Sequence, residues 1–180
     1  MASVIIANSN KDSARRIGAV LKSSGLLLSG ICTTGAQVME MTNYHYRGGV
    51  VVCSLDLPDL PAADLPGMAR NYDFLFIAKP FQAGMVPALE SACLMTPLRK
   101  PELSASVYMF LNLSDPVSPA VKKKIASGAL DAKEIVGRAK ALLMERNYFT
   151  EPQAHRFLQK KSMDTGKKLA ETAMVVLELF

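Results

Sequence analysis

The chain has 180 residues, of which 49% are hydrophobic and 21% charged, and its formal net charge is +5. This composition excludes a disordered chain, and no apolar run approaches the roughly 20 residues that cross a bilayer. All of the excess charge falls in residues 116–180, which hold twelve Lys or Arg against seven Asp or Glu, so this part is expected to meet a polyanion.

Five short apolar segments rich in β-forming residues alternate with helical stretches along the first 113 residues. A helix is predicted from about Lys11 to Ser24, with Asn10 as its N-cap. Near-continuous apolar strands separated by helices predict an α/β fold with a five-stranded parallel sheet, in the flavodoxin-like arrangement. The predicted strands are Ser3–Ala7, Leu26–Cys32, Val50–Cys53, Phe74–Ala78 and Ala92–Met95.

The order of these segments resembles the CheY-like receiver domain of phosphorelay proteins, over roughly residues 1–113. The resemblance implies an acidic pair after the first strand, which holds Mg²⁺, and a phosphoacceptor Asp at the end of the third strand, four residues before a Pro. Here Ala7 and Asn8 stand at the first place, and the residue four before Pro58 is Ser54. Asp56 lies two residues further on and is expected to point away from the strand end.

The other positions of a receiver site are changed as well. The resemblance implies Ser or Thr at the end of the fourth strand and Lys-Pro after the fifth, where this chain has Ala78 and Thr96-Pro97. Lys79-Pro80 has the Lys-Pro form, but only three strands would then precede its own. Because phosphoryl transfer depends on positioned charge and a metal, we expect a pseudo-receiver without phosphoacceptor chemistry. Its degenerate pocket is expected to consist of Ala7, Asn8, Ser54, Ala78 and Thr96.

Such a front domain would serve as a scaffold, a dimerisation surface or a sensor of another signal, or its vacated pocket would bind a small ligand or a partner protein.

Residues 99–113 are expected to form its closing helix, and turn formers at 112–119 mark the boundary. We assign residues 1–114 to the pseudo-receiver domain, 115–130 to a connecting helix and 131–180 to a second domain. Apolar residues at four- and three-residue steps from Val121 to Leu142 predict either a dimer helix or an amphipathic helix packed on its own domain.

Three short amphipathic helices are predicted in residues 131–180. The first runs from about Asp131 to Arg146 and breaks at residues 147–149. A T-x-x-Q capping box at Thr150–Gln153, with Pro in the first turn, starts the second helix, and residues 164–166 end it. The buried stripes are expected to be Ile135, Ala139, Leu142 and Leu143 in the first helix, Ala154, Phe157 and Leu158 in the second, and Leu169, Ala173, Val176 and Leu177 in the third.

These helices resemble the ANTAR domain, the small RNA-binding module of bacterial transcription antiterminators, over about residues 131–177. The resemblance rests on Ala139–Met144 (AKALLM), Ala154-His155 and Ala173. Ala141 stands where the family usually has Gly and His155 where an aromatic is more frequent, but both are compatible with a helix and His can stack on a base. The resemblance implies dimeric binding to paired stem-loops in mRNA leaders, so that polymerase reads through a terminator.

Recognition of RNA loops combines cationic contacts to phosphate with stacking by planar side chains, and the three helices supply both. Lys167 and Lys168 are expected in the first turn of the third helix, where they oppose the helix dipole, which favours a role other than stability. We expect a homodimer, constitutive or controlled by a regulatory protein partner, and no enzymatic activity. The expected RNA-binding residues are Arg138, Lys140, Arg146, Tyr148, His155, Arg156, Lys160, Lys161, Lys167 and Lys168.

Two other functions are compatible with parts of this sequence. Three basic helices also suit a DNA-binding helix-turn-helix, although none carries the Asn, Gln and Arg cluster that reads base edges. A flavodoxin-like enzyme or nucleotide binder would need a Gly-rich phosphate loop, whereas Asn8–Lys11 follows the first strand.

Cys32, Cys53 and Cys93 are too widely spaced for a metal site and favour buried reduced thiols, and no cofactor is expected. The first residues lack the basic region of a signal peptide, which indicates a cytoplasmic protein with no membrane contact.

Overall fold

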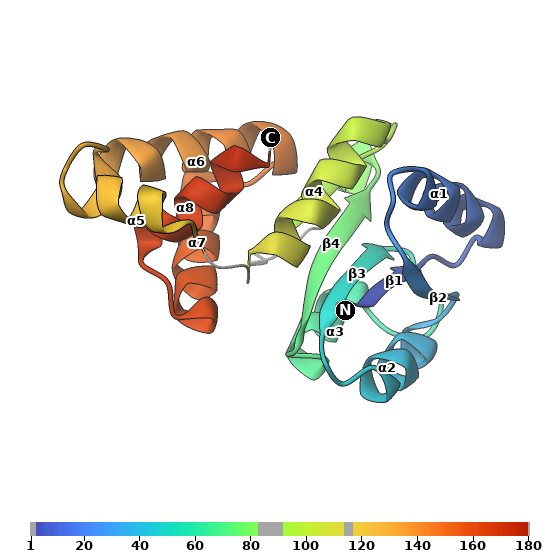
Figure 1. Ribbon diagram of the computed structural model, residues 1–180. Helices are drawn as coiled ribbons and strands as arrows, with labels where there is room; N and C mark the ends of the chain where they lie inside the picture. The colour runs from blue at the N-terminus through green and yellow to red at the C-terminus, as the bar shows by residue number, and fades with distance from the viewer. Residues whose placement is uncertain (1–2, 83–91, 114–116, 180) are drawn as a thin grey trace. The chain divides into compact units, whose positions relative to one another are not determined.

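The computed structural model describes residues 3–82, 92–113 and 117–179. It divides the chain into two compact units, Met1–Val107 and Tyr108–Phe180, here named the front unit and the helical unit. Figure 1 follows the chain through both units. The predicted turn at 112–119 includes residues 114–116, which lie outside the described residues. The assigned domain boundaries at 114 and 130 stay a prediction.

A five-stranded parallel sheet, in the order β2-β1-β3-β4-β5, forms the centre of the front unit and confirms the predicted α/β fold. The second strand begins at Leu28 and not at Leu26 as predicted. The cause is Gly25, whose positive φ of 83° turns the chain so that the Leu26 amide donates to the Leu21 carbonyl at 3.1 Å. The strands are β1 Ser3–Ala7, β2 Leu28–Cys32, β3 Gly49–Ser54, β4 Tyr72–Ala78 and β5 Ala92–Met95.

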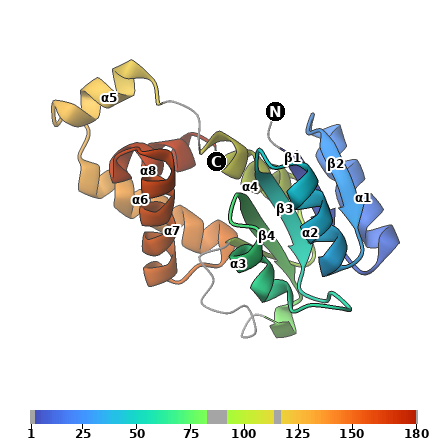
Figure 2. The same cartoon turned by 90° about the horizontal axis from the view of Figure 1, so that it is seen from below.

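Helices cover both faces of the sheet, and Figures 1 and 2 show α1 on one side and α2 and α3 on the other. Successive strand residues alternate between the faces, so Ile5, Val51 and Phe76 share one core with Val38 of α2 and Leu65 of α3. The helices are α1 Lys11–Ser23, α2 Gly35–Tyr44, α3 Leu65–Met68 and α4 Lys100–Asn112, with short 3-10 turns η1 Ala62–Asp64 and η2 Pro80–Gln82.

The local signals for the first helix are confirmed. Asn10 is its N-cap, and the Asn10 side chain accepts hydrogen bonds from the amides of Asp12 and Ser13 at 3.0 and 2.9 Å.

The three cysteines are free and buried, as predicted. Burial raises the pKa of Cys32 and Cys93 to about 11 and that of Cys53 to about 12, so these thiols are poor nucleophiles.

In the helical unit, α6, α7, α8 and the end of α4 pack around one core, whereas α5 buries none of its residues. Phe157 is the centre of this core: its ring lies 5.6 Å from that of Phe110 and 5.4 Å from that of Phe149, between centroids. Of the predicted stripes, Leu142, Leu169 and Leu177 are partly exposed and the other eight residues are buried. The helices are α5 Pro119–Ala126, α6 Ala132–Asn147, α7 Glu151–Thr165 and α8 Leu169–Glu178.

The apolar residues spaced at four- and three-residue steps from Val121 to Leu142 lie on two helices, α5 and α6, so their heptad-like spacing does not form one seam. α5 ends at Ala126, and Gly128 adopts a φ of +72°, which reverses the chain before Asp131 caps α6 through a 2.8 Å hydrogen bond to the Lys133 amide. A heptad-like spacing that continues across a left-handed glycine does not form one seam. The repeat therefore belongs to two separate helices.

Candidate functional sites

A pocket of about 400 Å³ lies where the strands β1, β3, β4 and β5 end. It brings together four of the five residues predicted for the degenerate phosphorylation pocket, namely Asn8, Ser54, Ala78 and Thr96. The fifth, Ala7, is buried in β1 and does not line the pocket. Parallel strands place their carboxyl ends at one edge of the sheet, which explains how residues so far apart in sequence meet here.

The local turns occupy two of the polar groups of this pocket. Asn8 Oδ1 accepts a hydrogen bond from the Asn10 amide at 2.9 Å, and Ser54 Oγ accepts one from the Asp56 amide at 3.4 Å. Within the described residues, no group of three or more His, Cys, Asp or Glu is placed to hold a metal ion. The end of β3 presents a hydroxyl where the receiver resemblance implies a carboxylate.

The expectation that Asp56 points away from the strand ends is wrong. Its carboxylate lines the pocket, where Lys79 Nζ donates to Oδ2 at 2.9 Å and Gln82 Nε2 donates to Oδ1 at 2.6 Å. The hydrogen bond from Lys79 and that from Gln82 hold the pKa of Asp56 below its usual range, although partial desolvation opposes them. Lys79, which directly follows β4, and Gln82 of η2 thus hold the Asp56 carboxylate at the edge of the sheet where β3 ends.

Four of the predicted RNA-binding cations are exposed in the helical unit: Arg138, Arg156, Lys160 and Lys168. Arg156 and Lys160 lie one turn apart on α7, so both side chains emerge on the same side of that helix. Tyr148 is also exposed, at 56%, because it ends α6 in a left-handed conformation with a φ of 56°. His155 is partly exposed on α7.

Lys161 does not belong to the exposed face on which it was predicted. Only 9% of the residue is exposed, and its ammonium lies 6.0 Å from the centroid of the Phe110 ring. A cation over an aromatic face is attracted by the negative ring quadrupole. Lys161 is therefore part of the interior of the helical unit, where its side chain packs beside Phe110.

The two lysines before α8 also differ from their prediction. α8 begins at Leu169 with Lys168 as its N-cap residue, so neither lysine lies in its first turn. Lys167 Nζ donates a hydrogen bond to the Leu113 carbonyl, just after the end of α4. Lys167 therefore satisfies a backbone acceptor inside the unit, and Lys168 alone of the pair is exposed.

The remaining two predicted cations are partly buried. Lys140 Nζ lies 2.7 Å from Glu151 Oε1, and this hydrogen bond together with the lysine charge lowers the pKa of Glu151. Arg146 has a buried Nε that meets no hydrogen-bond acceptor among the described residues. A phosphate that contacts Lys140 must compete with the carboxylate of Glu151.

Three basic residues were missed by the sequence analysis. Lys122, Lys123 and Lys124 are all exposed on α5, a helix that buries none of its residues. The signal was visible as a run of three lysines, but the segment was interpreted only as a connecting helix. These lysines extend the basic surface of the helical unit.

The parallel sheet with its flanking helices defines a receiver-like front, and the helical unit that follows carries the exposed cations. Residues 126–177 match the family model of the ANTAR domain, so the chain contains an ANTAR domain. Over 168 residues the chain is 24% identical to "Transcriptional regulatory protein PdtaR" of Mycobacterium tuberculosis (strain CDC 1551 / Oshkosh), an alignment that covers 88% of this chain and 81% of PdtaR. The chain is homologous to that transcriptional regulatory protein.

Solved structures agree with the receiver-like fold. The signal receiver domain of the putative response regulator NarL from Mycobacterium tuberculosis superposes with a TM-score of 0.52 at 16% identity, over 59% of this chain and 93% of that domain. A response regulator receiver protein from Sinorhizobium medicae WSM419 gives a TM-score of 0.54 at 18% identity, over 62% of this chain and 94% of its own. Among the described residues, no helix is both long and apolar enough to span a membrane.

Proposed function

We propose that this protein regulates transcription by binding stem-loop RNA in mRNA leaders through its ANTAR domain, and that binding prevents termination. The observation that carries the proposal is the exposure of Arg156 and Lys160 one turn apart on α7, within the matched module. Two cations at this spacing can contact successive phosphates of one strand, while Tyr148 and His155 offer planar rings to unstacked loop bases. We also propose a homodimer in the cytoplasm as the binding species.

Charge reversal of the exposed pair tests this proposal. We expect the double variant Arg156→Glu, Lys160→Glu to bind an RNA of two adjacent stem-loops at least tenfold more weakly than the parent in a gel shift. The matched control is Arg15→Glu, Lys22→Glu on α1, which makes the same charge change in the front unit and should stay within twofold. Equal affinity of the α7 variant and the parent would reject this surface, and preference for duplex DNA of equal length would favour the helix-turn-helix alternative.

We propose in addition that the front unit is a pseudo-receiver. The support is chemical: among the described residues that line the pocket at the strand ends, Asp56 alone has a carboxylate, and Lys79 and Gln82 both donate hydrogen bonds to it. A hard cation such as Mg²⁺ needs several oxygen ligands, and an acyl phosphate needs a free carboxylate. A regulatory protein partner would then control the front unit in place of phosphorylation.

Incubation with acetyl phosphate and Mg²⁺ tests the pseudo-receiver proposal. We expect no phosphoryl adduct in the intact mass of the full chain, with a phosphorylatable receiver protein as the positive control. An adduct on the parent chain would contradict the proposal. Its loss in Asp56→Asn would then identify Asp56 as a displaced phosphoacceptor.

A further inference from the structure

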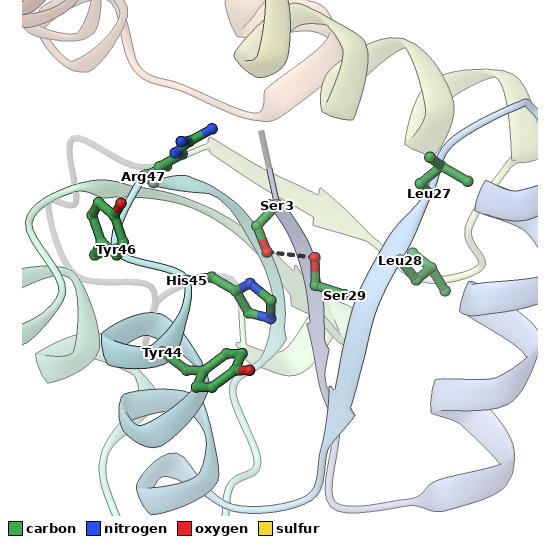
Figure 3. A pocket seen from close by; sticks show the side chains of 9 residues that line it. Ser3, Leu27, Leu28, Ser29, Tyr44, His45, Tyr46 and Arg47 are labelled. Carbon is green, nitrogen blue, oxygen red and sulfur yellow. Dashed lines mark hydrogen bonds between the residues drawn. The ribbon is translucent and has the colours of Figure 1, made fainter. Parts of the chain in front are cut away.

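A second pocket, of about 360 Å³, lies at the other edge of the sheet, where the strands β1, β2 and β3 begin. Figure 3 shows its floor, a hydrogen bond of 2.6 Å between the Ser3 and Ser29 hydroxyls, with the rings of Tyr44 and His45 directed toward that pair. Tyr46, Arg47 and Leu27 complete the rim. None of these residues belongs to the proposed RNA surface or to the pocket at the strand ends.

The loop that carries Tyr44 to Arg47 is held rigidly from beneath. The Tyr72 hydroxyl donates to the His45 carbonyl at 2.7 Å, and Asn71 Nδ2 of the side-chain amide donates to the Tyr46 carbonyl at 2.8 Å. Gly48 closes the loop with a φ of +81°, where an added Cβ would lie 2.3 Å from the Asn71 carbonyl oxygen. The backbone of the loop is therefore fixed before a ligand binds, which lowers the entropic cost of binding.

The exposure of the rim is unusual for apolar side chains. Tyr44 is 80% exposed, Tyr46 73% and Leu27 73%, all around one hollow. Aromatic rings held open at a pocket offer faces on which a planar ring can stack. Clustered exposure of this kind marks a binding site more often than a solvated surface.

The charged and polar groups that line the pocket determine which ligand charge it favours. Arg47 is exposed at the rim, His45 adds an N–H donor and Ser29 an O–H donor, since the Ser3 hydroxyl already donates to Ser29. Among the described residues that line the pocket, none is a carboxylate. A guanidinium binds phosphate in a bidentate way, and hydroxyl groups donate to its remaining oxygens. The lining therefore favours an anion and disfavours a cation.

We propose that this pocket binds a ribonucleotide, with the base stacked on Tyr44 or Tyr46 and the phosphate held by Arg47. The volume lies at the lower end of the range for small-ligand pockets, which suits a single nucleotide. The site differs from the phosphate loop of a flavodoxin-like nucleotide binder, since it lies at the opposite edge of the sheet. The base and the phosphate could belong to a free nucleotide or to an unstacked nucleotide within an RNA strand.

Calorimetric titration of the full chain with two probes tests the proposal and separates these sources. The probes are adenosine 5′-monophosphate and a single-stranded RNA pentamer without a 5′ phosphate. We expect saturable binding of the monophosphate, weakened at least tenfold in Arg47→Glu and about tenfold in Tyr44→Ala, Tyr46→Ala. Tighter binding of the pentamer, with the same sensitivity to Arg47→Glu, would identify an RNA strand as the source and would still support the pocket.

A matched aromatic control shows whether binding depends on this pocket. Phe81→Ala removes an exposed ring of the front unit that does not line the pocket, and it should leave nucleotide binding unchanged. Tyr72→Phe keeps every rim side chain but removes the hydroxyl that holds the His45 carbonyl, so it should weaken binding by severalfold. Absence of saturable binding of both probes, or binding that is insensitive to Arg47→Glu, would overturn the proposal. Neither outcome would affect the stem-loop experiment on α7.

Discussion

Lys161 provides a test of whether charge on α7 serves folding or RNA binding. The side chain is 9% exposed and its ammonium faces the Phe110 ring, whereas Arg156 on the same helix is exposed. Lys161→Glu replaces the cation by a carboxylate that the face of the ring repels and that the interior does not solvate. We expect a loss of stability on the order of 3 kcal/mol for this variant, against about 0.5 kcal/mol for Arg156→Glu.

Urea unfolding, followed by circular dichroism of the helices, measures the difference. For a unit of this size the unfolding free energy changes by about 1 kcal/mol per molar urea, so the transition of the helical unit should move by about 3 M in Lys161→Glu. Lys161→Met keeps an unbranched side chain in the same space and should lose only about 1 kcal/mol, the size of the cation–π contact. The methionine variant should also bind stem-loop RNA like the parent. If Lys161→Glu were as stable as Arg156→Glu, the interior position of Lys161 would be refuted.

Three further predictions concern the charged groups. Glu151→Gln removes the carboxylate that holds Lys140 and should tighten stem-loop binding two- to fivefold at low salt, measured by gel shift; weaker binding would contradict this. The pKa of Asp56 is lower in the folded chain than in the unfolded chain. The pairing with Lys79 therefore stabilises the front unit at pH values above the unfolded pKa, and this stabilisation is lost as the pH falls below about 4. Because both side chains are about half exposed, Asp56→Asn should lower the free energy of unfolding by only about 0.5 kcal/mol at pH 7 and should not change it at pH 2. Urea titrations measure both values, and an equal loss at the two pH values would contradict the pairing. The logarithm of RNA affinity should fall as the logarithm of salt concentration rises, with a slope between about −3 and −4 per protomer if the four exposed predicted cations, Arg138, Arg156, Lys160 and Lys168, contact phosphates. A slope near zero would exclude these contacts.

The parts of the fold that local chemistry determines were predicted closely. Both β1 and β5 have the predicted bounds, and Asn10 caps α1 as its position before the helix indicates. The Thr150 amide and hydroxyl both donate to Gln153 Oε1, at 2.8 and 2.9 Å, so the side chain of the predicted capping box closes the start of α7. In each case the interacting groups lie within four residues of one another, and no tertiary information is needed.

The candidate sites were predicted less well because they depend on contacts between distant segments. The side chain of Asp56 is turned by Lys79 and Gln82, which β4 and η2 bring to it. Lys161 was assigned to the exposed face from helical spacing, yet its exposure depends on Phe110 of α4, which closes over this part of α7. The loop from Tyr44 to Arg47 gave no motif at all. Its anchors, Asn71 and Tyr72, lie after the third strand in sequence.

The basic residues of the helical unit serve at least three different purposes, and net charge alone does not distinguish them. Lys161 packs in the interior, Lys167 satisfies the carbonyl that follows α4, and Lys140 pairs with Glu151. Each of these uses reduces the number of cations that phosphate can reach. The excess charge of the C-terminal third therefore overstates its capacity for RNA, and the exposed residues of α7 have to supply a correspondingly larger share of the affinity. For this reason a double substitution at Arg156 and Lys160 should weaken binding more than its fraction of the total charge suggests.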